Sequence, residues 1–166
     1  MLVGAAAVAL AGCGGSKHAA ATTTAAPKPP SPARVLGAGA RTLYDGGAWA
    51  VVLRGRTAVA AHLVGGAWKA DRSGRVKVDV LGPRPGAVAA RQPQVAAELS
   101  GPARLVEEGL WVDGRELLEK GGGLSPSRVT VYGAPEAPLT RGTHVAVAYG
   151  RTRATGTAVA WSFRVR

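Results

Sequence analysis

The chain has 166 residues, which suffices for one domain with a sizeable core but excludes two large domains. Its 24 glycines and 11 prolines, with aromatic residues at only 5 %, favour many short elements broken by turns and therefore a β-rich domain. The formal net charge is +11. On an exported protein such a charge points to phospholipid headgroups or anionic wall polymers rather than nucleic acid, although surface arginines from GC-rich coding would give the same balance.

The segment Leu10-Ala11-Gly12-Cys13 combines an apolar residue, two small residues and a cysteine. It resembles the lipobox of bacterial lipoproteins. The resemblance implies cleavage between Gly12 and Cys13, a covalent diacylglycerol on Cys13, and an extracytoplasmic protein anchored to the inner or the outer membrane. The preceding residues, 1–12, carry no charge and are fewer than the ~15 to 30 of a usual signal segment, which favours a true start further upstream.

Cys13 is also the only cysteine of the chain, so the folded part has no disulfide, thiolate ligand or cysteine nucleophile. Residues 13–33 contain four prolines and no large apolar side chain, and we expect a disordered tether on this composition. Residues 34–81 then predict an antiparallel β-meander, with strands at 49–53, 57–63, 67–70 and 75–81 separated by glycine turns.

A Pro/Gly segment at 81–86 begins the second part, 82–166, in which we expect strands at 94–99, 110–112, 128–132, 143–149 and 157–165. An Asp113-Gly114 turn ends the second of these strands. Residues 115–120 have the spacing of a capped helical turn as an alternative to extended chain, and 121–123 and 125–126 are expected to be loop. In the last strand Trp161, Phe163 and Val165 share one face, so Trp161→Ala should be the most damaging change outside the glycines.

Residues 80–166 resemble the bacterial immunoglobulin-like domains of secreted and wall-associated proteins. The matching features are the Pro83/Pro85 entrance, the Val112-Asp113-Gly114 turn, Leu139-x-x-Gly142-Thr143-His144 and the terminal Ala160-Trp161-Ser162-Phe163-Arg164-Val165. The resemblance implies a two-sheet sandwich with Greek-key connections. It places Ala146 and Ala148 inward with His144, while Val145, Val147 and Tyr149 form the opposite face. We therefore expect the meander to pack on the sandwich as part of one all-β unit.

Candidate chemical groups are few. His18 lies in the tether, and His62 and His144 are weak candidate ligands for a periplasmic copper carrier, our alternative interpretation. Four carboxylates cluster in sequence, Glu107, Glu108, Glu116 and Glu119, and are expected to be solvated rather than paired across a cleft. With no catalytic motif in the sequence, we expect no enzyme and no cofactor beyond the lipid.

The leading interpretation is a lipid-anchored module of the cell envelope that acts as a binding module or as a spacer. Its expected partners are the membrane, through the lipid, and an anionic wall polymer or envelope protein, with no nucleic acid. The candidate surface for an anionic partner comprises Arg151, Arg153, Arg164 and Arg166. A further alternative is an accessory domain of a wall-remodelling system.

Overall fold

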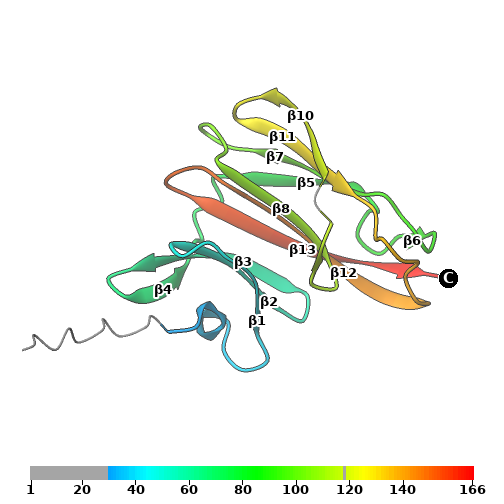
Figure 1. Ribbon diagram of the computed structural model, residues 1–166, viewed down its shortest axis with the longest axis horizontal. Coiled ribbons are helices and arrows are strands. Elements are labelled where there is room, and N and C mark those ends of the chain that lie inside the picture. The colour runs from blue at the N-terminus through cyan, green and yellow to red at the C-terminus, as the bar shows by residue number, and fades with distance from the viewer. Residues whose placement is uncertain (1–29, 118) are drawn as a thin grey trace, which may run out of the picture.

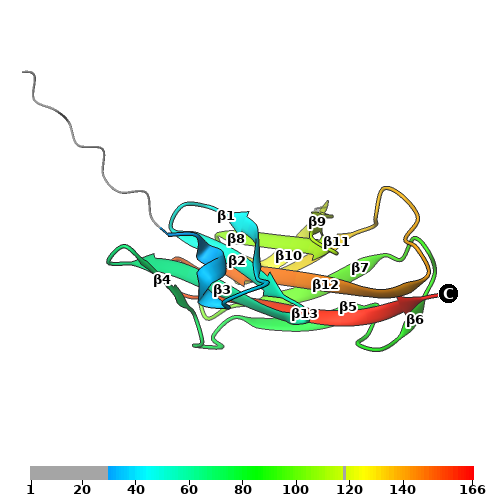
Figure 2. The same cartoon turned by 90° about the horizontal axis from the view of Figure 1, so that it is seen from below.

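The computed structural model describes residues 30–117 and 119–166, with the backbone alone for 119–124. The lipobox, Cys13, His18 and most of the predicted tether lie outside the described residues. The described chain confirms the all-β prediction: three sheets lie one behind another, and a short 3-10 helix, η1 (Pro32–Val35), precedes them (Figures 1 and 2).

The N-terminal sheet is a four-stranded meander in the order β1-β2-β3-β4. Its strands are β1 (Arg41–Asp45), β2 (Trp49–Arg54), β3 (Thr57–Val64) and β4 (Ala67–Ala70). The strands predicted at 49–53, 57–63 and 67–70 are confirmed as β2, β3 and β4, whereas β1 was not predicted. Each hairpin turn carries a glycine with positive φ, such as Gly55 at 57°. Pro32 of η1 is buried, so the folded part begins slightly before residue 34, the predicted boundary.

A two-sheet sandwich follows. One sheet has the order β10-β11-β7-β5, and the other has the order β6-β13-β12-β8-β9. The strands of the first are β5 (Lys77–Gly82), β7 (Val95–Ser100), β10 (Glu119–Ser125) and β11 (Arg128–Gly133). Those of the second, called the central sheet, are β6 (Val88–Ala89), β8 (Glu107–Val112), β9 (Arg115–Glu116), β12 (Gly142–Arg151) and β13 (Gly156–Val165). All pairs are antiparallel except β13 with β6.

The central sheet is covered on both faces. Toward the outer sheet of the sandwich, Ala146, Ala148 and Phe163 join one hydrophobic core. Toward the N-terminal sheet, Val147 and Tyr149 join a second core with Trp49, Val51, Leu53, Trp111 and Ala158. The expected packing of the meander on the sandwich is therefore confirmed, and Figure 1 shows the N-terminal sheet lying beside β8, β12 and β13.

Three expectations need correction. The strand predicted at 75–81 was assigned to the meander, but β5 pairs with β7 in the sandwich, because Val76, Val78 and Val80 pack into the sandwich core. The helical alternative for 115–120 is wrong where the structure describes it: the Asp113-Gly114 turn, with φ of 50° and 85°, returns the chain onto β8 as β9. Residues 121–123, expected as loop, belong to β10, whose pairing with β11 overrides the glycine composition.

Candidate functional site

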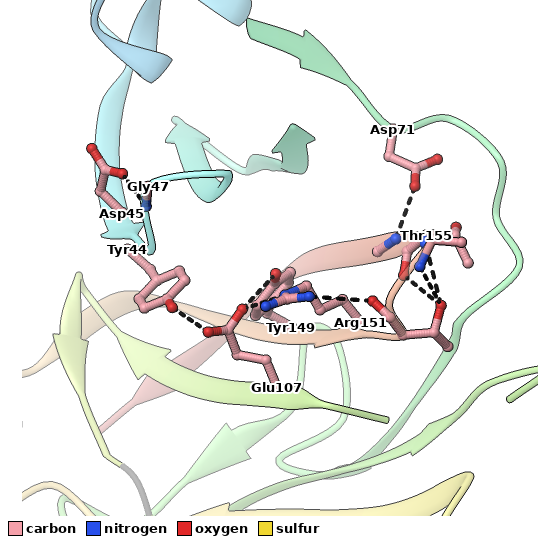
Figure 3. A network of polar contacts seen from close by, with 11 residues as sticks. Tyr44, Asp45, Gly47, Asp71, Glu107, Tyr149, Arg151 and Thr155 are labelled. Carbon is pink, nitrogen blue, oxygen red and sulfur yellow. Dashed lines mark hydrogen bonds and ion pairs between the residues drawn. The ribbon is translucent and has the colours of Figure 1, made fainter. Parts of the chain in front are cut away.

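A polar cluster joins the N-terminal sheet to the central sheet (Figure 3). Glu107 of β8 lies at its centre. Its carboxylate accepts hydrogen bonds from the hydroxyl of Tyr44 on β1 and from the hydroxyl of Tyr149 on β12, the latter at 3.3 Å. The Nε of Arg151 donates to the same carboxylate at 2.5 Å. We call these four residues the Glu107 network.

Arg151 also lies against the N-terminal sheet, with its guanidinium carbon 5.7 Å from the centroid of a Trp49 ring. Its side chain is 22 % exposed and that of Glu107 is 24 % exposed. The guanidinium is therefore engaged by a carboxylate and an aromatic face. Arg151, expected at an anion-binding surface, is a structural residue of the joint between sheets.

The protonation states in the Glu107 network are fixed at neutral pH. Burial acts to raise the pKa of Glu107, but the donors Tyr44, Arg151 and Tyr149 outweigh it and lower that pKa. The hydrogen bond to Glu107, helped by burial, raises the pKa of Tyr44 to about 12. Burial and the nearby carboxylate raise the pKa of Tyr149 further. None of these groups titrates near neutrality, so the network fits a role in holding layers together rather than in acid–base catalysis.

The turn between β12 and β13 is hydrogen-bonded to the segment between β4 and β5, which links the N-terminal sheet to the sandwich. Asp71 accepts a hydrogen bond from the backbone nitrogen of Gly156 at 2.8 Å, and the Ser73 and Thr155 hydroxyls lie 2.5 Å apart. Thr152 is buried, and its hydroxyl accepts from the backbone nitrogen of Thr155. Arg153 lies in the same turn and is exposed, as expected for a residue of the candidate surface.

His144 occupies a corner between β8 and β12. Its Nδ1 lies 2.7 Å from the carboxylate of Asp113, and its Nε2 lies 2.8 Å from the carbonyl oxygen of Thr140. Burial acts to lower the pKa of His144, but these two acceptors outweigh it and raise the pKa. Because both ring nitrogens face acceptors, the ring is suited to a charged, structural role and offers no lone pair to a metal.

The two candidate metal ligands are not brought together. His62 lies on β3 and packs on Trp49, with ring centroids 5.0 Å apart, whereas His144 packs on Phe163 on the other side of the central sheet. Among residues 30–117 and 119–166 no group of three or more potential ligand side chains is found. The described residues therefore contain no assembled metal site that would support the copper-carrier interpretation.

Three exposed arginines lie together at the other end of β12 and β13. Arg164 and Arg166 are exposed, as expected, and Arg141 joins them around an open hollow that Gly142 and Val165 complete. Sequence reasoning missed Arg141. The signal was available, because extending the predicted antiparallel pairing of the last two strands sets Gly142 opposite Val165.

No protein-family model and no curated protein sequence matches this chain. None of the described helical turns is long and apolar enough to cross a membrane.

Proposed function

We propose that the protein is a lipid-anchored module of the bacterial cell envelope, without catalysis of its own, in which an immunoglobulin-like sandwich and its N-terminal sheet act as one rigid binding or spacing unit. The lipobox Leu10-Ala11-Gly12-Cys13 carries the proposal. It precedes by about twenty residues a domain in which the Glu107 network joins two layers.

The strand orders support the immunoglobulin-like assignment. In an immunoglobulin sandwich the first, second, fifth and fourth strands form one sheet, and the third, sixth and seventh form the other. Leaving out the short β6 and β9, the strands of this sandwich are β5, β7, β8, β10, β11, β12 and β13 in chain order. Their arrangement as β10-β11-β7-β5 and β13-β12-β8 follows that order.

The Glu107 network supports the rigid unit. It ties β1 of the N-terminal sheet to β8 and β12 of the sandwich, and the two parts also share a hydrophobic core. A rigid unit of this kind suits a module that holds a binding surface at a set distance from an anchor.

The test is detergent phase partitioning of the protein expressed from its own gene, so that the native translation start is used. We expect the wild type in the detergent phase and the Cys13→Ser variant in the aqueous phase. Ser16→Ala is the matched control and should behave as the wild type. A wild type that partitions into the aqueous phase together with Cys13→Ser would contradict the anchor.

A further inference from the structure

We propose that the hollow lined by Arg141, Arg164 and Arg166, called the distal arginine hollow, binds the phosphate groups of a phosphodiester polymer of the cell wall. The choice of the wall as the source rests on the function proposed above. The affinity for phosphate rests on the hollow alone.

The hollow is built on a rigid base. Gly142 pairs with Val165 and Thr143 pairs with Arg164, so two antiparallel strands bring the arginines together. Phe163 and Val165 beside them are buried, and the backbone nitrogen of Arg164 donates to the carbonyl oxygen of Ala87 at 2.8 Å. The backbone that presents Arg164 is therefore held from both sides.

The side chains that line the hollow carry a net positive charge. They include three exposed guanidinium groups and no aspartate or glutamate side chain. Within the part of the chain that the structure describes, none of the three makes an ion pair, whereas Arg128 pairs with Glu98 and Arg151 pairs with Glu107. An anion entering the hollow would relieve the repulsion among the three cations and offer each a charge-assisted hydrogen bond.

The number and direction of the donors favour phosphate over carboxylate. One guanidinium fork satisfies a planar carboxylate, but the tetrahedral oxygens of phosphate accept donors arriving from several directions. Arg141 directly precedes β12, Arg164 lies near the end of β13, and Arg166 directly follows β13. A single phosphate at such an exposed site would bind weakly, whereas a polymer that presents phosphates repeatedly raises their effective concentration and releases many counterions.

The position of the hollow favours the wall over the bilayer. Figures 1 and 2 show that the described chain starts near one end of the long axis and that the C-terminus lies at the other end, where the hollow is. The hollow therefore lies at the end of the domain away from the residue at which the described chain begins.

The experiment measures the affinity of the full chain, carrying Cys13→Ser to keep it soluble, for long-chain inorganic polyphosphate at two salt concentrations. The test variant is R141Q/R164Q/R166Q. The control is R56Q/R72Q/R75Q, which removes the same charge from other exposed positions. We expect the test variant to bind about tenfold more weakly with a smaller salt dependence, and the control to lose about twofold or less.

Several results would overturn the assignment. Equal losses in the two variants would mean that net charge alone attracts polyanions. Equal affinity of the wild type for polyglutamate would remove the phosphate preference, and a loss confined to vesicles containing phosphatidylglycerol would make the bilayer the partner. Thermal unfolding checks that both variants fold. Because the lipid on Cys13 is absent from this assay, a failed anchor and a failed hollow give different results.

Discussion

The Glu107 network makes a quantitative prediction through the Glu107→Gln variant. The amide has nearly the same shape as the carboxylate but no charge, and it cannot accept from Tyr44, Tyr149 and Arg151 together. Hydrogen bonds to a charged group contribute about 1.5–3 kcal/mol each when buried. Since the Glu107 and Arg151 side chains are 24 % and 22 % exposed, solvent takes over part of this loss. We expect a decrease of about 2–3 kcal/mol in the free energy of unfolding.

The assay is urea unfolding of the wild type and Glu107→Gln, followed by tryptophan fluorescence. Trp49 lies against Arg151 and reports on the joint directly. Glu136→Gln, at an exposed position on the 134–141 connection, is the control and should change stability by less than about 0.5 kcal/mol. The stabilisation from Glu107 should be present above its ordinary pKa of 4.5 and lost as the pH falls through its lower folded value, because the pKa is lowered by folding.

A double-mutant cycle with Arg151→Gln separates the pair from its surroundings. Strong coupling between Glu107 and Arg151, of about 1 kcal/mol or more, is the expected outcome. If Glu107→Gln costs no more than Glu136→Gln and the cycle gives no coupling, the network does not hold the layers together and the reasoning is refuted.

Three further variants test other contacts by the same unfolding assay. Trp161→Ala removes a side chain that is 4 % exposed and that donates a hydrogen bond to the Pro83 carbonyl. The free energy of unfolding should fall by about 3–5 kcal/mol. A decrease below about 1 kcal/mol would contradict the place of Trp161 in the core. His144→Gln should lose more stability relative to the wild type at about pH 6 than at about pH 8. Folding raises the pKa of His144, so the stabilisation from the charged ring is lost as the pH rises through the pKa of the folded state. An equal difference in stability at both pH values would argue against a charged ring. Gly133→Ala should unfold the edge of the sandwich, since its methyl group would overlap the Leu117 carbonyl, and a wild-type stability would show that this contact yields easily.

The sequence predicted strands well where local pattern and turn chemistry agree. The last hairpin is an example, because the alternation from 157 to 165 fixes both the strand and its buried face. The β2–β3 and β3–β4 hairpins of the N-terminal sheet are another, since a glycine turn joins each pair of strands.

The hydrophobic pattern of the sequence did not predict the features that depend on pairing between strands. The valine alternation of β5 gives a buried face but carries no information on which sheet receives it. Residues 121–123 have no side chains from which a period can be read, and their strand exists through its pairing with β11.

The candidate site shows the same limit. From the sequence, Arg151 was predicted to be one exposed arginine among several. Its partner Glu107 is 44 positions away along the chain, so no local pattern indicates the pair. Charge counts of a sequence do not separate paired from unpaired arginines. The structure does so, because it pairs Arg151 with Glu107, and the proposed anion-binding hollow is lined instead by Arg141, Arg164 and Arg166.

Mass spectrometry of the N-terminal peptide of the native protein, purified from cells without overexpression, tests the anchor most directly. The proposed function predicts a peptide that begins at Cys13 and carries diacylglycerol on its sulfur. An unmodified Cys13 inside a longer peptide, from protein recovered in the cytosol, would contradict it.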